Sequence, residues 1–160
     1  MQVSFRTLTL LAATFFIGAP MLASAQSMCP IMIETENDGD EVVRYKGKEV
    51  FLCCSTCTRM WEANPDYYAK VALTLDLLPQ FKDDKEKLLA EDLKDIELLE
   101  QRFCPLRPES VVSPDSPFVE YEGKKIYFFR ERDIERRWTP SAEEKFAEAR
   151  EAGLLPQFDE

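Results

Sequence analysis

The chain of 160 residues contains two copies of one pattern, and this duplication constrains its fold more than any other feature. The matching segments are Cys29-Pro30 with Cys104-Pro105, residues 45–51 (YKGKEVF) with 121–127 (YEGKKIY), Trp61 with Trp138, and LLPQF at 77–81 with LLPQF at 154–158. All of them occur in the same order at a nearly constant separation, which chance would rarely produce. The sequence therefore predicts two small structural units in tandem.

Each copy predicts a β-hairpin followed by helices. Alternating apolar residues on both sides of Gly47 and of Gly123 indicate hairpins, the first with a turn at Lys46-Gly47. Helices are expected over 55–63 and 131–138, with second helices that begin at Asn64-Pro65 and Thr139-Pro140 (or at a capping box of Ser141 and Glu144) and end near Leu75 and Ala152, where Gly153 is a C-cap.

Residues 83–102 separate the two copies. Leu89, Leu93, Ile96 and Leu99 recur at helical spacing, which predicts an amphipathic connecting helix packed on both units. The expected fold class is thus α+β, with two small tandem units joined by this helix. The expected divisions are 1–25, a signal peptide; 26–82, the first unit; 83–102, the connecting helix; and 103–160, the second unit.

The first 25 residues resemble a targeting segment rather than part of the fold. Arg6 is their only charged residue, residues 7–22 are apolar, and Ala23-Ser24-Ala25 is a small-residue cleavage motif. The sequence predicts a signal peptide cleaved after Ala25 and an exported, periplasmic or secreted protein without a later membrane span. An uncleaved anchor is the alternative.

The charge and cysteine content narrow the classes of partner and site. Thirty acidic and 20 basic residues give a net charge of −10, which argues against nucleic acid and anionic membranes as partners. The five cysteines all follow residue 25, and the chain has no histidine. A metal site would therefore be built mainly from sulfur, while an oxidising compartment would favour disulfides and leave one thiol unpaired.

Three of the cysteines lie where the first hairpin meets its helix. Cys53, Cys54 and Cys57 follow the β-favouring run 50–52, close to the unpaired N–H groups and the positive end of the helix dipole. That position favours thiolates, which are both metal ligands and nucleophiles. Cys53 and Cys57 are four residues apart and so share one helix face, and Cys29, in a turn beside a proline, can approach them across the hairpin.

The pattern resembles the YHS and TRASH group of small cysteine-containing domains. It combines Cys29-Pro30, the Tyr45-x-Gly47-Lys48 hairpin, the cysteine run and Trp61 four residues after its last member. The resemblance covers 29–68 well and 104–146 as a degenerate copy. It implies treble-clef-like units that bind heavy metals, alone or attached to copper and mercury transport and sensing proteins. The implied ligands are Cys29, Cys53 and Cys57, with Cys54 as a candidate extra ligand.

The second copy lacks the thiol cluster. When Tyr45 is aligned with Tyr121, the residues opposite Cys53, Cys54 and Cys57 are Phe129, Arg130 and Asp133. The second unit is therefore expected to be a structural partner or a binding face. Cys104, the counterpart of Cys29, is either a buried free thiol or a disulfide partner of Cys54.

Four interpretations of the cysteines remain open. The first is a site for Cu(I), or for Zn(II) with a fourth ligand from Cys54, a carboxylate or water. The second is disulfides, from Cys29 to Cys53 or Cys57 and from Cys54 to Cys104. The third is redox chemistry at the Cys54-x-x-Cys57 motif. The fourth is an interaction scaffold, although both tryptophans are expected in the core.

The metal interpretation implies two kinds of partner, a metal ion and a metal-transport or metal-handling protein. No catalytic constellation is visible, so the sequence does not predict an enzyme.

Overall fold

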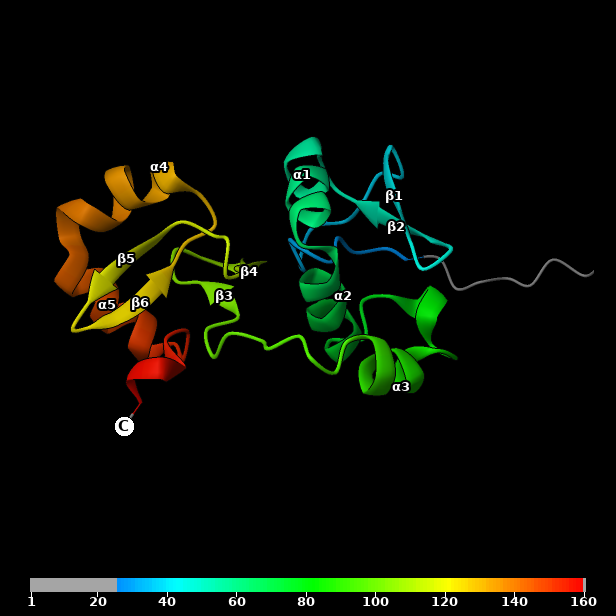
Figure 1. Cartoon of the computed structure of the whole chain (residues 1–160). Helices are drawn as coiled ribbons and strands as arrows, with labels where there is room; N and C mark the ends of the chain where they lie inside the picture. Colours follow the sequence, from blue (N-terminus) through cyan, green and yellow to red (C-terminus); the bar gives the residue numbers. More distant parts are fainter. Residues whose placement is uncertain (1–25, 160) are drawn as a thin grey trace, which may run out of the picture.

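The structure is a computed structural model that describes residues 26–159, and the predicted signal peptide lies outside these residues. The fold is α+β, with three two-stranded antiparallel sheets in the described part of the chain. Figure 1 shows the elements β1 to α3 on one side of the molecule and β5 to α5 on the other. Among residues 26–159, no helix has both the length and the apolar character needed to cross a membrane.

The two predicted hairpins are present. Strands β1 (Glu41–Tyr45) and β2 (Lys48–Leu52) pair in register from Tyr45–Lys48 to Glu41–Leu52. Their two-residue turn has positive φ at Lys46 (47°) and Gly47 (81°), as a tight turn between twisted strands requires. Strands β5 (Phe118–Tyr121) and β6 (Lys124–Tyr127) are joined in the same way by Glu122 and Gly123.

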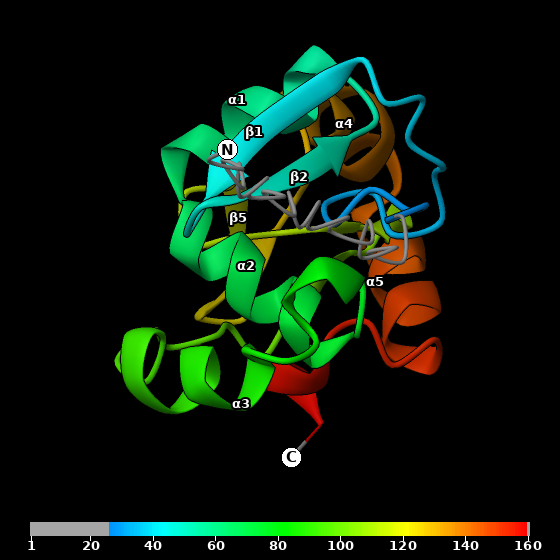
Figure 2. The same ribbon diagram turned by 90° about the vertical axis from the view of Figure 1, so that its right-hand side faces the viewer.

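The first hairpin leads into two consecutive helices, α1 (Ser55–Ala63) and α2 (Pro65–Thr74). Pro65 occupies the first turn of α2, as predicted, because the helix start needs no N–H at that position. The Asn64 side chain does not cap the helix and instead donates to Asp115 at 2.8 Å. In the view of Figure 2, the β1–β2 hairpin lies against α1.

The second hairpin leads into a less regular helical region. The helix α4 (Glu131–Asp133) continues as a π-helix over Ile134–Trp138 and a 3₁₀ turn over Thr139–Ser141. The helix α5 (Ala142–Glu151) therefore begins after Ser141, later than the Thr139-Pro140 start, and Ser141 makes no side-chain capping bond. It ends at Glu151, close to the predicted end near Ala152, and is followed by Gly153, whose φ is 68°.

The predicted connecting helix over 83–102 is wrong beyond Asp92. A short helix, α3 (Lys85–Lys87), continues as a π-helix over Leu88–Asp92 and then ends. The Lys70 ammonium donates to the carbonyl oxygens of Leu93 and Ile96 at 2.8 and 2.7 Å. The apolar spacing correctly indicated a buried residue, since Leu93 is completely buried. The helix nevertheless stops, because the carbonyl oxygens of Leu93 and Ile96 accept hydrogen bonds from the Lys70 side chain instead of from the next helical turn.

A third hairpin joins the two halves of the molecule. Strands β3 (Phe103–Cys104) and β4 (Arg107–Val111) pair with each other, and this hairpin was not predicted. The N–H of Ile33 donates to the Glu109 carbonyl and the N–H of Val111 donates to the Ile31 carbonyl, both at 2.8 Å. The segment that follows Cys29 is thus paired with β4.

Aromatic side chains fill the core of each half. Trp61 and Trp138 are each only 2% exposed, which confirms the prediction that both belong to the core. Two 3₁₀ turns, Pro79–Phe81 and Pro156–Phe158, bring their phenylalanines back onto the hairpins. Their rings meet those of Tyr45 and Tyr121 at centroid distances of 6.0 and 6.5 Å.

Two buried glutamines form corresponding hydrogen bonds in the two halves. Gln26 donates to the carbonyl oxygens of Met28 and Phe51 and accepts from the Phe51 N–H and from Gln80. Gln101 donates to the carbonyl oxygens of Phe103 and Tyr127 and accepts from the Tyr127 N–H and from Gln157. Each glutamine therefore ties the second strand of a hairpin to the segment that precedes the hairpin.

Candidate metal centre

Three cysteine sulfurs lie close together at the junction between β2 and α1. Cys53 follows β2 directly, Cys57 lies in the first turn of α1, and Cys29 reaches them from the segment before β1. All three sulfurs lie within 4.8 Å of one another, so they could hold one metal ion. The structure thus brings together the three ligands that the sequence predicted.

The spacing of the sulfurs suits a single thiophilic ion. The Cys53 and Cys57 sulfurs are 3.6 Å apart. With a metal–sulfur bond of about 2.3 Å, two thiolates on a tetrahedral ion lie about 3.8 Å apart, and two on a trigonal ion lie about 4.0 Å apart. The observed 3.6 Å and the 4.8 Å limit on the trio bracket these values, so only small side-chain adjustments separate this arrangement from a coordination shell.

Local backbone geometry places the sulfurs. Cys54 is extended (φ −170°, ψ 162°) and is the N-cap of α1, and its carbonyl accepts the first helical hydrogen bond from the Thr58 N–H at 3.1 Å. Cys53 therefore precedes the helix, and the bend at Cys53 and Cys54 places its sulfur 3.6 Å from that of Cys57. The Cys29 N–H donates to the Thr35 carbonyl at 2.9 Å, which fixes the turn that carries the third sulfur.

Cys29 is completely buried, yet its surroundings favour the thiolate. The adjacent Cys57 thiol and the backbone N–H groups of Met32, Ile31 and Cys53 lower the pKa of Cys29 to about 5 against the effect of burial. The Met32 N–H lies 3.4 Å from this sulfur. The protein therefore provides one preformed anionic ligand at the buried side of the site.

The other two sulfurs of the trio are held as thiols by that thiolate. Burial and the nearby Cys29 sulfur raise the pKa of Cys53 to about 12. The hydrogen bond to Cys29, together with burial, raises the pKa of Cys57. A bound cation would replace these two protons, since coordination to a metal deprotonates a thiol.

Cys54 lies at the edge of the trio and is half-buried. Its sulfur is 3.6 Å from that of Cys57 and 3.9 Å from that of Cys53. Burial would raise its pKa, but the backbone N–H groups of Cys57 and Thr56 outweigh that effect and lower it. Cys54 is therefore a fourth sulfur within reach of two ligands, outside the group of three.

The aligned positions in the second copy of the sequence pattern hold an ion pair instead of sulfur. Asp133, opposite Cys57, is only 3% exposed and accepts a hydrogen bond from the Arg107 guanidinium at 2.7 Å. Arg107 follows Cys104 by three residues, as Met32 follows Cys29. This hydrogen bond lowers the pKa of Asp133, so the carboxylate stays charged in a buried position.

Cys104 does not join the thiol cluster. It is buried beside the backbone N–H groups of Phe129, Leu106 and Arg107, and burial raises its pKa. The five cysteines, all of which the structure describes, are free thiols. The structure thus places Cys104 as a buried free thiol, one of the two alternatives that the sequence left open.

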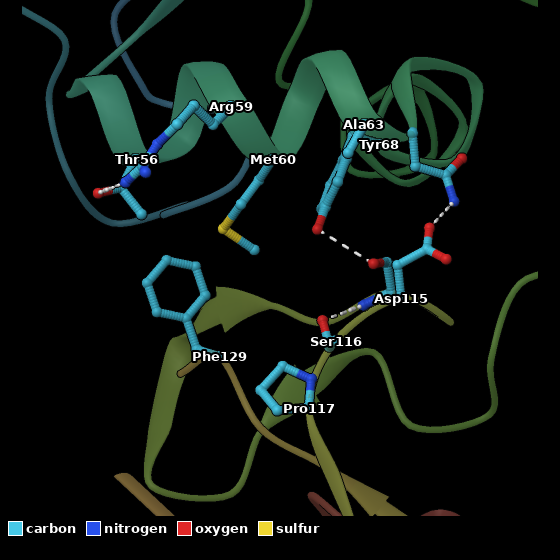
Figure 3. A pocket seen from close by; sticks show the side chains of 11 residues that line it. Thr56, Arg59, Met60, Ala63, Tyr68, Asp115, Ser116, Pro117 and Phe129 are labelled. Atoms are coloured by element: carbon cyan, nitrogen blue, oxygen red, sulfur yellow. Dashed lines mark hydrogen bonds between the residues drawn. The ribbon is translucent and has the colours of Figure 1, made fainter. Parts of the chain in front are cut away.

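A separate cavity of about 280 Å³ lies between the two halves. Figure 3 shows Met60 and Tyr68 facing Phe129 and Ser116 across it. The Tyr68 hydroxyl bonds to the Ser113 hydroxyl at 3.2 Å. The residues that line the cavity include no cysteine of the described chain, so the cavity is distinct from the thiol cluster.

Comparison with protein families, with curated proteins and with solved structures found no match to the chain. The resemblance to YHS and TRASH domains stays a prediction that depends on the residues quoted above.

Two features of the structure, the pair of buried glutamines and the Arg107–Asp133 ion pair, were not predicted from the sequence. Gln26 and Gln101 stand three residues before the two Cys-Pro motifs, so extending the repeat toward the N-terminus would have revealed them. The Arg107–Asp133 pair could have been suspected from opposite charges at two positions where the first unit has uncharged residues. Its burial, however, depends on β3 and β4, which were not predicted.

Proposed function

We propose that the protein is an exported metal-binding protein whose Cys29, Cys53 and Cys57 thiolates hold one soft or borderline ion, Cu(I) or Zn(II). The observation that carries this proposal is the convergence of three sulfurs within 4.8 Å of one another. Thiolate ligands and the absence of histidine from the chain favour thiophilic ions over Ca²⁺ or Mg²⁺.

The two ions would use the site differently. Cu(I) is satisfied by two or three thiolates, which the trio supplies. Zn(II) prefers four ligands, and Cys54, 3.6 Å from the Cys57 sulfur, or a water molecule would complete its shell. In both cases Cys29 and Cys57, which are completely buried, would shield the ion from solvent.

In this proposal the molecule consists of two tandem YHS/TRASH-like units, with the metal in the first. The corresponding hydrogen bonds of Gln26 and Gln101 support the duplication. The second unit would be a structural partner, stabilised by Arg107 and Asp133 where the first unit has its metal. The biological role would be metal handling or sensing, with a metal-transport or metal-handling protein as partner, and no enzymatic reaction is assigned.

A disulfide-stapled module without metal is the second candidate function. Sulfurs 3.6 Å apart need little movement to form a bond, and export would provide an oxidising compartment. The contact of Cys54 with Cys57, also 3.6 Å, similarly supports a CxxC thiol redox protein as the third candidate.

Native mass spectrometry of the mature chain distinguishes the first two candidates. The protein is purified from the exported fraction without reductant or chelator, so that bound metal and free thiols are counted together. We expect one ion per chain with at least three free thiols, and the mass of the ion identifies copper or zinc. A metal-free chain that lacks four hydrogens would contain two disulfides and would refute the metal site.

The redox candidate requires a separate measurement. Under that interpretation the protein would exchange its dithiol with a small-molecule disulfide, and Cys54→Ser would abolish the exchange. We expect no catalytic turnover with such a disulfide.

A further inference from the structure

We propose that Cys54 is the exchange ligand of the metal site, the residue through which the ion enters and leaves. This inference rests on the proposed binding of a thiophilic ion by Cys29, Cys53 and Cys57. It assigns Cys54 a function in transfer rather than in holding the ion at equilibrium.

Burial leaves one side of the cluster accessible. Cys29 and Cys57 are completely buried, whereas Cys53 and Cys54 are half-buried. An external ligand therefore reaches the ion from the side of these two adjacent residues. Cys53 belongs to the group of three sulfurs that surround a common centre, so Cys54 is the accessible sulfur that remains available.

Distances allow Cys54 to take over the ion without a change of fold. Its sulfur lies 3.6 Å from Cys57 and 3.9 Å from Cys53, close to the separation of about 3.8 Å expected for two thiolates on one ion. An ion can thus move from the buried group to one that contains Cys54 by small side-chain movements.

The backbone favours such movement at Cys54 in particular. The residue stands between β2 and α1, and its backbone is held by the Thr58 N–H on its carbonyl. Its sulfur contacts those of Cys53 and Cys57 and lies outside the group of three that contains Cys29. The side chain can therefore change rotamer while the strand and the helix stay in place.

Transfer then proceeds by successive ligand substitutions. The Cys54 thiolate bonds to the ion as the bond from Cys29 to the ion breaks, which moves the ion toward solvent. An external ligand then bonds to the ion as the bonds from Cys57, Cys53 and Cys54 break in turn. The oxidation state of the ion does not change, Cys53 and Cys57 take up one proton each from solvent, and Cys29 stays a thiolate.

The experiment compares the same substitution at two neighbouring cysteines, Cys54→Ser and Cys53→Ser, in the full mature chain loaded with one Cu(I). Affinity is measured at equilibrium by competition with bathocuproine disulfonate, whose Cu(I) complex is coloured. The rate of transfer to excess chelator is measured by stopped-flow absorbance. If the native ion is zinc, Zn(II) and 4-(2-pyridylazo)resorcinol replace this pair.

We expect Cys54→Ser to slow transfer by about tenfold or more, while its affinity stays within about threefold of wild type. Cys53→Ser should instead lose most of the affinity. Far-UV circular dichroism verifies that both variants fold.

Two results would overturn the inference. One is equal transfer rates for Cys54→Ser and wild type, and the other is a loss of affinity in Cys54→Ser as large as that in Cys53→Ser, which would make Cys54 an equilibrium ligand. Failure of the wild-type chain to bind either ion is a different outcome, because it refutes the proposed function itself.

Discussion

Cys57 and Asp133 occupy corresponding positions in the two halves, and the difference between these residues separates the proposed metal site from its counterpart. Both side chains are buried, at 0% and 3% exposure. A buried thiol beside other sulfurs can bind an ion, whereas a buried carboxylate needs a cation within the protein, which Arg107 supplies. The positions of Cys57 and Asp133 thus correspond, but a thiol at one and a carboxylate at the other give them different chemistry.

Substitution of single cysteines should divide them into two groups. Cys53→Ser and Cys57→Ser remove a sulfur from the trio, so we expect both variants to lose binding of Cu(I) and Zn(II). Cys104→Ser should retain it, because Cys104 lies outside the cluster. Metal content after dialysis, measured by mass spectrometry, tests this. Equal losses from all three variants would favour disulfide stapling instead.

The ion pair between Arg107 and Asp133 predicts a pH dependence of stability. Arg107 holds the pKa of Asp133 below its ordinary value of 3.8, so the unfolded chain binds this proton more readily than the folded protein. The contribution to the free energy of unfolding is therefore complete above about pH 5 and is lost as the pH falls through the acid range. Asp133→Asn should cost about 2 kcal/mol at pH 7, and the difference from wild type should shrink toward about pH 3.

Urea denaturation at several pH values measures this dependence. Glu131→Gln, an exposed substitution on the same helix, is the control and should change stability by less than about 0.5 kcal/mol. A deficit in Asp133→Asn that stays constant with pH would show that the carboxylate charge is not what stabilises the unit.

The sequence predicted that Cys53 and Cys57 lie together because spacing within one strand–helix junction is local information, whereas Cys29 was included through the expected hairpin and the family resemblance. In the structure α1 begins at Ser55, so Cys53 lies just outside the helix, and the bend at Cys53 and Cys54 keeps its sulfur beside that of Cys57. Arg107 and Asp133 could not be paired in the same way, because their contact depends on the β3–β4 hairpin and on the turn after β6. That contact is tertiary, and the sequence contained no spacing that specified it.

At the scale of secondary structure elements, a buried glutamine connects the β1–β2 hairpin, and another the β5–β6 hairpin, to a segment that precedes it. Gln101 is only 2% exposed and uses both its donor and its acceptor atoms on backbone and side-chain partners. Such a side chain replaces ladder hydrogen bonds that a two-stranded sheet cannot provide at its edge. The hairpins therefore depend on polar contacts as well as on their apolar faces.

Gln101→Ala should destabilise the protein by about 3 kcal/mol, because the Tyr127 N–H and the carbonyl oxygens of Phe103 and Tyr127 would lose their partner. The midpoint of chemical denaturation measures the loss. Glu100→Ala, the exposed neighbour, should change it by less than about 0.5 kcal/mol. Equal midpoints for the two variants would mean that water replaces the amide without cost.

Prediction succeeded for elements whose signals are local and failed where tertiary contacts override them. The hairpin turns at Gly47 and Gly123 and the helix over 55–63 follow from turn residues and periodicity. The segment 83–102 has equally good periodicity, yet its helical part ends at Asp92. Beyond that point the Lys70 ammonium binds the carbonyl oxygens of Leu93 and Ile96. Periodicity indicates which side chains are buried, and several backbone paths can bury them.

At the scale of the whole molecule, the proposed metal site and the junction between halves share one segment. Residues 29–33 carry the Cys29 sulfur at one end and pair with β4 through Ile31 and Ile33 at the other. An ion bound by Cys29 would fix this segment and, through β4, the Arg107–Asp133 pair of the second unit. Metal binding in one half should therefore stabilise both.

The two tryptophans allow this coupling to be measured, because Trp61 lies in the first half and Trp138 in the second. We expect saturating metal to raise the unfolding midpoint reported by Trp138 in Trp61→Phe as much as that reported by Trp61 in Trp138→Phe. An ion at 100 times its dissociation constant adds about 2.7 kcal/mol to a cooperative unit. If only the Trp61 signal shifts, the strand pairing between Ile31 and Val111 is too weak to couple the halves, and the second unit unfolds independently of the metal.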